Sequence, residues 1–300
     1  MVGTSEGTRI TVTRVLITGA QGMLGRDLLQ VFSDMDVRGL GKEELDIRDA
    51  QSVATHTAGF DVVINAAAYT KVDDAESDET SAWAINSEGP KNLAKALRAH
   101  GGRLIQISTD YVFDGSATNP YPEKTQTAPL SAYGRTKEGG EQAVLAEYPE
   151  SSLIVRTSWL YGKSGSSFPK SILNAGKVKE HLDVVDDQIG QPTWTKDVAT
   201  MVHSLVKSGP RSGIFHATNS GQTSWYGFAR KIFQLAQWNP DRIRPVPSSA
   251  FPREAPRPAW SVLGHGEWEK NGLPAPRPWE LALEDAWVSG LNSFLEDARI

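Results

Sequence analysis

The feature that most constrains the fold is a short apolar run followed at once by three regularly spaced glycines. Residues 14–18 (Arg-Val-Leu-Ile-Thr) are rich in β-branched residues and have the length of a buried strand. Gly19, Gly22 and Gly25 follow, and a helical pattern continues to Phe32. Glycines at a strand-to-helix turn let the backbone approach a pyrophosphate at the helix N-terminus. The alternative is a glycine-rich turn without a ligand, but its place between a first strand and a helix favours dinucleotide binding.

The rest of the chain predicts an α/β, Rossmann-like, doubly wound parallel sheet. Eight of the nine tryptophans lie at or beyond Trp159, so the second half differs in texture. We therefore expect a dinucleotide-binding domain over residues 1–165 and a smaller C-terminal substrate-binding domain over residues 166–300. The first ~13 residues are expected to be an extension, and parts of residues 182–216 to return to the first domain. Four further apolar runs are candidate strands of the sheet: residues 36–40, 61–64, 103–108 and 153–156.

A tyrosine and a lysine four residues apart open the helix that follows the fourth strand. Their i, i+4 spacing places Tyr133 and Lys137 on one face, and Ser131 is the expected N-cap. A phenol titrates near ~10, and a neighbouring ammonium lowers that pKa toward the working range. With the strand-end hydroxyls of Ser108 and Thr109, the pair predicts a proton-transfer triad. Since Tyr-x-x-x-Lys also occurs by chance on surface helices, the glycine motif is what gives it weight.

The end of the second strand bears on the choice of dinucleotide. A carboxylate at this point would hold the ribose 2′-hydroxyl and select NAD. Gly41 and Lys42 stand there instead and leave room and positive charge for a 2′-phosphate. This favours NADPH over NADH, although Glu43 and Glu44 follow closely.

Two more segments are placed to meet the cofactor. Asp46 and Ile47 follow the second strand and can contact the adenine, the alternative for Asp46 being a helix cap. The third strand ends in small residues against which the nicotinamide-side ribose can lie. The predicted cofactor-binding set is Gly19, Gln21, Gly22, Met23, Leu24, Gly25, Asp46, Ile47, Ala66, Ala67, Ala68, Tyr69, Ser108, Tyr133 and Lys137.

The helical pattern from about residue 80 to residue 100 contains an expected interruption. Asn86 and Gly89 lie inside it, and both are poor helix formers. We expect a kink here, or an Asn86 side chain bonded to neighbouring backbone.

Composition excludes several classes of function. A net charge of −5 provides no basic field for nucleic acid or an anionic membrane. The absence of cysteine excludes thiolate metal sites and fits a reducing cytosol, so a cytoplasmic location is expected. No apolar run approaches the roughly 18 residues of a membrane span, and the N-terminus lacks the apolar segment of a signal peptide. Six scattered histidines predict no metal site, and the oligomeric state is open, with a homodimer among the possibilities.

Taken together, the glycine turn and the Tyr-Lys pair resemble an extended short-chain dehydrogenase/reductase. Longer motifs resemble one family within it, the dTDP-4-dehydrorhamnose reductases. Those enzymes perform the last step of dTDP-L-rhamnose synthesis and reduce a 4-keto-6-deoxy sugar with NAD(P)H. The motifs lie at residues 65–76, 108–115, 156–162, 187–193, 257–261 and 279–283.

The resemblance implies a role for each matching residue. Tyr133 would donate the proton, Lys137 would bind the nicotinamide ribose, and Thr109 would orient the keto oxygen. The acidic strand-two residue common in relatives is replaced by Gly41, which leaves the choice between NADPH and NADH open. The implied substrate contacts are Thr70, Thr109, Asp110, Tyr111, Tyr133, Trp159 and Gln191.

Three alternatives remain at this point. A dehydratase of the same superfamily is disfavoured, because Tyr111 stands where those enzymes carry a second carboxylate. A reductase or epimerase for another 4-keto-6-deoxy sugar nucleotide is compatible with the motifs. A non-catalytic NADP(H)-binding regulatory subunit would not need Thr109, Tyr133 and Lys137, so the retained triad argues against it.

Overall fold

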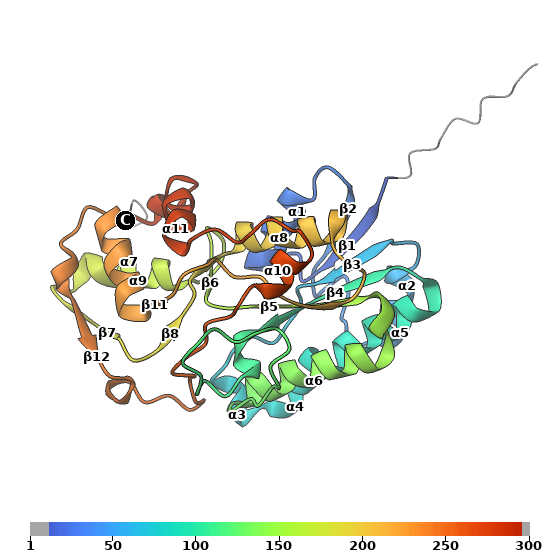
Figure 1. Ribbon diagram of the computed structural model, residues 1–300, viewed down its shortest axis with the longest axis horizontal. Helices are drawn as coiled ribbons and strands as arrows, with labels where there is room; N and C mark the ends of the chain where they lie inside the picture. The colour runs from blue at the N-terminus through green and yellow to red at the C-terminus, as the bar shows by residue number, and fades with distance from the viewer. Residues whose placement is uncertain (1–11, 296–300) are drawn as a thin grey trace, which may run out of the picture.

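The computed structural model describes residues 12–295, which form a larger and a smaller part (Figure 1). The predicted N-terminal extension falls almost wholly outside the described residues. The larger part is built on a six-stranded parallel sheet with the order β10-β5-β4-β3-β1-β2. Strand order reverses beside β1, and in such sheets ligands bind outside the carboxyl ends of the strands at this point. The strands are β1 (Arg14–Thr18), β2 (Asp36–Leu40), β3 (Val62–Asn65), β4 (Arg103–Thr109), β5 (Ser152–Thr157) and β10 (Gly213–His216).

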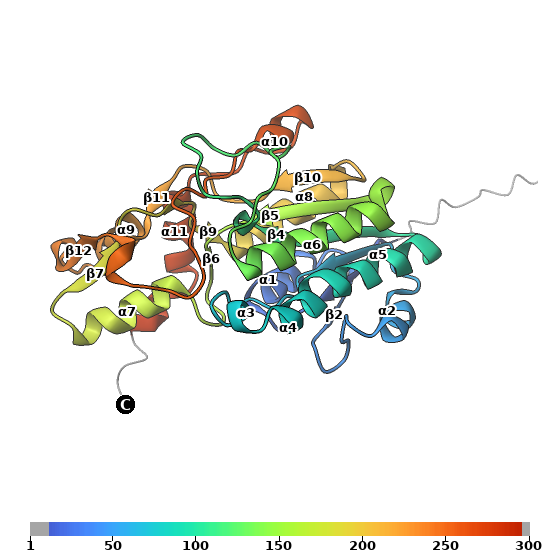
Figure 2. The ribbon, with the colours of Figure 1, turned by 90° about the horizontal axis from the view of Figure 1, so that it is seen from below.

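Helices cover both faces of this sheet (Figures 1 and 2). Alternate side chains of a strand point to opposite faces, so β1 contributes to two cores. Val15 and Ile17 pack toward α1 and α8, whereas Leu16 packs toward α2 and α5. The expected doubly wound architecture is confirmed. The covering helices are α1 (Met23–Val31) and α8 (Thr195–Ser208) on one face, and α2 (Ala50–Thr57), α5 (Gly89–His100) and α6 (Ala132–Glu147) on the other.

The expected interruption near Asn86 is a π-helical turn, Ala84–Glu88, between α4 (Glu79–Trp83) and α5. The Asn86 amide donates to the carbonyl of Tyr69 and to the hydroxyl of Thr136, and its oxygen accepts from the Tyr69 N–H. Asn86 therefore bonds to backbone, as predicted, and also ties the loop after β3 to helix α6. A short helix, α3 (Asp74–Ser77), precedes this segment.

The smaller part is a mixed assembly around an aromatic core. Tyr161, Phe228 and Trp279 are all buried in it. The antiparallel pair β8–β11 and the parallel pair β7–β12 lie at its edges. After β5, the elements α8, β10 and α10 (Gly266–Lys270) belong to the larger part instead, since β10 pairs with β5 and Trp268 of α10 is buried in the same core as α8 (Figure 2). The remaining elements of the smaller part are α7 (Phe168–Val178), α9 (Trp225–Leu235), α11 (Trp279–Val288), β6 (Leu160–Tyr161), β7 (Leu182–Val185), β8 (Ile189–Gly190), β9 (Thr193–Trp194), β11 (Thr223–Ser224), β12 (Ile243–Val246) and short 3-10 turns at residues 240–242, 248–250 and 291–295; further 3-10 turns, at residues 110–112 and 149–151, follow β4 and precede β5.

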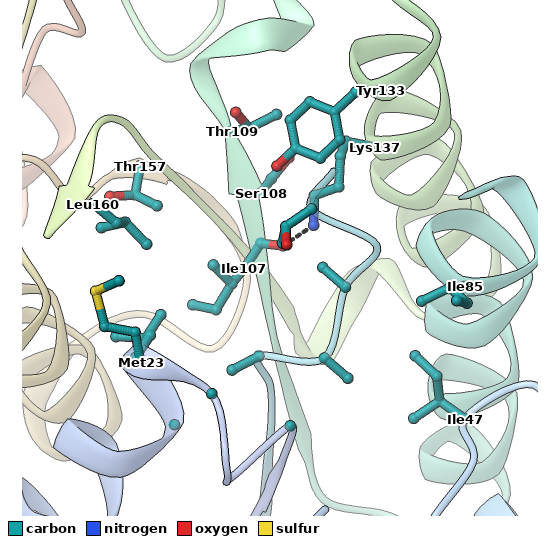
Figure 3. A pocket seen from close by; sticks show the side chains of 18 of the residues that line it. Met23, Ile47, Ile85, Ile107, Ser108, Thr109, Tyr133, Lys137, Thr157 and Leu160 are labelled. Carbon is teal, nitrogen blue, oxygen red and sulfur yellow. Dashed lines mark hydrogen bonds between the residues drawn. The ribbon is translucent and has the colours of Figure 1, made fainter. Parts of the chain in front are cut away.

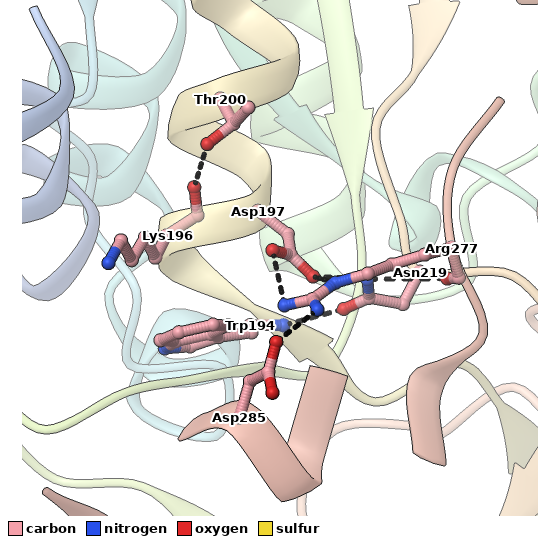
Figure 4. A network of polar contacts seen from close by, with 7 residues as sticks. All are labelled: Trp194, Lys196, Asp197, Thr200, Asn219, Arg277 and Asp285. Carbon is pink, nitrogen blue, oxygen red and sulfur yellow. Dashed lines mark hydrogen bonds and ion pairs between the residues drawn. The ribbon is translucent and has the colours of Figure 1, made fainter. Parts of the chain in front are cut away.

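A polar network centred on Arg277 joins the two parts (Figure 4). The guanidinium donates to both carboxylate oxygens of Asp197, at 2.8 and 2.9 Å, and to Asp285 at 2.5 Å. Asn219 donates to Asp197 as well, and accepts from the N–H of Trp194. Since Asp197 lies on α8 and Asp285 on α11, the network connects the sheet-covering helix to the smaller part. Within residues 12–295, no helix has the length and hydropathy needed to cross a membrane.

Candidate active site

A cavity of about 680 Å³ lies at the carboxyl ends of the central strands, where the topology predicts a ligand site. The glycine turn after β1 and the N-terminal half of α6 both line it. Figure 3 shows Tyr133, Lys137 and Thr109 together on one side, with Met23 and Leu160 across from them. Ile47 and Ile85 lie toward the other end.

The glycine turn has the close backbone approach that its sequence predicted. Gly19 has φ +66°, and a Cβ there would lie 2.6 Å from the backbone nitrogen of Ala67. A Cβ on Gly25 would overlap the carbonyl oxygen of Gly19. Helix α1 begins at Met23, and its N-cap, Gly22, has no side chain to bind the first-turn amides. These amides are left for an anionic ligand.

At the end of β2 the cavity is lined by Gly41, Lys42 and Arg48. Two of the nearby acids are engaged: Glu44 accepts from the Gly41 N–H at 2.9 Å, and Asp46 holds the Arg48 guanidinium with bonds of 2.5 to 3.0 Å. The alternative role of Asp46 as a helix cap is wrong, because Asp49 caps α2. Arg48 was missed by sequence reasoning, and its basic side chain close to the strand end was the available signal.

The three members of the predicted triad are brought together. Lys137 is buried, and its ammonium donates to the carbonyl of Ile107 at 2.7 Å (Figure 3). The rings of Tyr133 and Tyr111 meet edge to face at 5.5 Å. Ser131 caps the helix as predicted, its hydroxyl accepting from the Gly134 N–H. The N-terminus of α6 thus holds the phenol and the ammonium at one wall of the cavity.

The titration of these groups differs from the expectation. Burial raises the pKa of Tyr133 to about 12, an effect that the Thr109 hydroxyl opposes and the Asp110 carboxylate reinforces. Burial also lowers the pKa of Lys137 to about 8, against the attraction of Glu141. A lowered pKa was predicted for Tyr133, and that prediction is wrong, since desolvation of the phenolate dominates. At neutral pH Tyr133 is therefore a neutral phenol that can donate a proton.

Asp110 is a buried carboxylate at the cavity wall with one oxygen unpaired among the described residues. It is 2% exposed, and its Oδ1 accepts from the Thr109 hydroxyl at 3.0 Å. Its Oδ2 has no hydrogen-bond partner among the described residues. Burial raises the pKa of Asp110 to about 6, with the hydroxyls of Ser261 and Thr109 opposing. A buried carboxylate oxygen without a partner is costly and is suited to a ligand hydroxyl.

A buried ion pair supports this wall from behind. Arg156 of β5 and Glu141 of α6 bind in parallel, with Nε–Oε1 at 2.9 Å and Nη2–Oε2 at 2.6 Å. The hydroxyl of Ser108 donates to the same Glu141 carboxylate. Sequence reasoning assigned no role to Glu141 or Arg156, although an arginine at the end of a buried apolar strand was a signal.

Two predicted site residues do not line the cavity. The buried amide of Gln191 donates to the Leu263 carbonyl, and its oxygen accepts from the Leu263 N–H and the Thr218 hydroxyl, so these bonds hold it away from the cavity lining. Tyr69 binds Asn86 through its backbone and lies outside the lining. All the other predicted residues line the cavity. Lining residues that sequence reasoning did not single out include Val72, Ile85, Thr157, Leu160 and Ser166.

Comparison with known proteins places the chain in a family. The family model described as "RmlD substrate binding domain" matches residues 13–290. The chain belongs to this family. The predicted resemblance to the dTDP-4-dehydrorhamnose reductases is thereby confirmed, and with it the oxidoreductase class.

Individual family members are similar over most of the chain. A probable dTDP-4,6-dihydroxy-2-methyloxan-3-one 4-ketoreductase of Streptomyces antibioticus is 47% identical over 281 residues, covering 91% of this chain and 94% of that protein. A dTDP-4-dehydrorhamnose reductase of Mycobacterium tuberculosis is 41% identical and covers 100% and 98%. The crystal structure of dTDP-4-dehydrorhamnose reductase from Bacillus anthracis in complex with NADP superimposes with a TM-score of 0.89 at 38% identity, covering 93% and 100%.

Proposed function

We propose that this protein reduces the C4 keto group of dTDP-4-dehydro-6-deoxy-L-mannose (dTDP-4-dehydrorhamnose) to dTDP-L-rhamnose with NAD(P)H. The observation that carries this proposal is that one cavity joins a dinucleotide-type glycine turn to Tyr133, Lys137 and Thr109. Relatives named dTDP-4-dehydrorhamnose reductase, 41% identical or more, support the choice of substrate.

The residues around the cavity fit a dinucleotide. The close approach at Gly19 and the uncapped start of α1 suit a pyrophosphate. Lys42 supplies positive charge beside the end of β2, next to the Arg48 guanidinium that Asp46 holds, and this suits the 2′-phosphate of NADPH. When bound, NAD(P)H supplies the hydride for carbon C4 of the sugar. Lys137, whose ammonium is anchored on Ile107, holds the nicotinamide-side ribose.

Tyr133 provides the proton. Its raised pKa keeps the phenol neutral at pH 7, and the alkoxide that forms at C4 is a stronger base than phenolate. Thr109 lies beside Tyr133 and orients the keto oxygen (Figure 3). The protein thus contributes position and a proton, and transfer of that proton completes the alcohol.

The remaining cavity wall holds the sugar nucleotide. Asp110, whose Oδ2 has no partner among the described residues, accepts from a sugar hydroxyl, while Tyr111 and Thr70 contact the same ring. Trp159 forms the wall on the sugar–diphosphate side. Gln191 has no part in binding, because it lies outside the cavity lining and is held by Leu263. The chain has no cysteine, which fits a reducing compartment, and we place the reaction in the cytosol.

A second candidate is reduction of another dTDP-4-keto-6-deoxy sugar. Two of the similar relatives carry such names, one of them a dTDP-4-keto-6-deoxy-D-glucose reductase of Streptomyces niveus at 44% identity. The same triad would serve, and only the hydroxyl contacts around Asp110 and Tyr111 would differ.

The test is an NAD(P)H-oxidation assay against a panel of dTDP-4-keto-6-deoxyhexoses, with both cofactors and with product analysis. We expect one NAD(P)H to be consumed for each dTDP-L-rhamnose formed, with NADPH preferred. Cofactor binding without oxidation by any member of the panel would contradict an enzymatic role and favour the regulatory subunit.

A further inference from the structure

Trp159 has an unusual backbone conformation at the wall of the cavity. Its φ is +45°, and only Gln237 shares a positive φ among the non-glycine residues that the structure describes. A bulky side chain is rarely found in this region, because its Cβ crowds the backbone. Such a conformation persists only where the surroundings enforce it, and it is concentrated at functional sites. The contacts around Trp159 show what enforces it.

Three neighbours hold Trp159. The indole of Trp225 stacks on it, with ring centroids 3.6 Å apart and planes 7° from parallel. Gly190 lies against its ring, and a Cβ there would come within 2.5 Å of an indole carbon. The Thr193 N–H donates to the carbonyl of Trp159 at 3.2 Å. The segment between Gly190 and Thr193 is in turn anchored by the side chain of Gln191, which makes two hydrogen bonds to the backbone of Leu263.

Trp225 is itself fixed from behind. It begins α9 in the smaller part, and its Nε1 donates to the side chain of Gln188 at 3.2 Å. Phe168 of α7 packs against it with ring centroids 4.6 Å apart, and Phe168 stacks on Phe228 in the same core. Trp225 does not line the cavity, whereas Trp159 does. The indole of Trp159, which follows β5 of the larger part, therefore rests on the aromatic core of the smaller one.

We propose that Trp225 is a positioning residue, which holds Trp159 as a flat apolar wall for a ring of the nucleotide sugar without touching that ring itself. This inference rests on the proposed function and deepens it. A 6-deoxy sugar has an apolar edge at its methyl group, and such surfaces pack well on an indole face. Trp225 then acts on substrate affinity only through Trp159, and it has no effect on dinucleotide affinity.

Ordinary core packing is the alternative account of the stack. It predicts that removal of Trp225 lowers stability and weakens both ligands alike. The chain offers a matched control in Trp238, a half-buried tryptophan of the same part. Its ring meets Phe233 at 5.1 Å and makes no aromatic contact with Trp159.

The experiment compares Trp225→Ala, Trp225→Phe, Trp159→Ala, the double variant Trp159→Ala/Trp225→Ala, and Trp238→Ala as the control. KM for each substrate, the dissociation constant of dTDP-L-rhamnose by calorimetry, and the melting temperature are measured for each. Far-UV circular dichroism records the exciton couplet that two stacked indoles produce.

We expect Trp225→Ala to raise KM and the dissociation constant for the nucleotide sugar roughly tenfold, with KM for NADPH unchanged. Trp225→Phe keeps an aromatic plane and should recover most of this loss. The double variant should bind no more weakly than Trp159→Ala, because Trp225 acts through Trp159 alone. The couplet should disappear in each variant that lacks either indole and persist in Trp238→Ala, whose KM values stay at wild-type level.

Additive losses in the double variant would overturn the proposal, as would equal weakening of NADPH and nucleotide sugar. If Trp225→Ala does not fold, Trp225→Leu decides, and unchanged sugar affinity in that variant would refute the positioning role. The proposed function can fail separately: wild-type protein that binds dTDP-L-rhamnose but oxidises no NAD(P)H would reject the reductase while the binding comparison still stands.

Discussion

Tyr133 is the residue on which the proposed chemistry depends most directly. Replacing it by phenylalanine removes the phenol that faces Lys137 and Thr109 in the cavity and leaves the ring's packing against Tyr111. We expect Tyr133→Phe to lower kcat by ~10²–10⁴, the usual contribution of a positioned acid. Calorimetry should show NADPH affinity retained. Loss of cofactor binding together with activity would mean that Tyr133 is structural.

Asp110 should make substrate binding sensitive to acid. Its pKa is raised to about 6, so the carboxylate acceptor is present above pH 6 and is lost as the pH falls through that value. Its neighbours Thr109, Tyr111, Tyr133 and Ser261 remain neutral in this range. We expect kcat/KM for the nucleotide sugar to fall below about pH 6. Asp110→Asn should have lower kcat/KM and lack this acid limb, and a limb that survives the substitution would assign it to another group.

Residue identity allowed the triad and most of the cavity lining to be predicted from sequence, but it could not show the partners of Gln191. Its amide is satisfied by Leu263, 72 residues further along the chain. The direction of the Tyr133 pKa was wrong for a related reason, since burial depends on the packed surroundings rather than on the Lys137 spacing. Local motifs carry residue types and turns, whereas desolvation and long-range bonding require the folded chain.

At the scale of elements, α6 and β5 are joined by a buried ion pair. The Arg156 and Glu141 side chains are only 2% and 4% exposed. Glu141→Gln leaves Arg156 buried without a counter-charge, so we expect the free energy of unfolding to fall by ~3–5 kcal/mol. Urea denaturation measures this change. The matched control is Glu79→Gln, which breaks the exposed pair between Glu79 of α4 and Arg135 of α6. This change should cost at most ~1 kcal/mol.

Elements were predicted where a local pattern determines them. The apolar runs of β3 and β5 gave the strands, because both are buried along their length and need no alternation. The interruption at Asn86 was also expected, since a poor helix former signals it. The short strands β8 and β11 were not predicted, because two-residue pairs depend on neighbours brought close by the smaller part.

The whole molecule depends on how the smaller part is held beside the sheet. Arg277 makes one polar connection, reaching Asp197 on α8 and Asp285 on α11 (Figure 4). The side chain of Asp197 is only 15% exposed, so water solvates its carboxylate poorly if Arg277 is removed. Trp194 packs under the guanidinium at 5.5 Å and would lose that contact too.

We therefore expect Arg277→Gln to destabilise the docking of α11 rather than the sheet. Loss of charged hydrogen bonds of this kind costs ~1–3 kcal/mol. Hydrogen exchange should become faster in α11 and β9 while β4 and β5 keep their protection, because their bonds lie within the larger part. The control is Arg230→Gln, which breaks a pair with Asp241 inside the smaller part. Faster exchange throughout both parts of Arg277→Gln would show that the network supports global stability, and that the two parts unfold as a single unit.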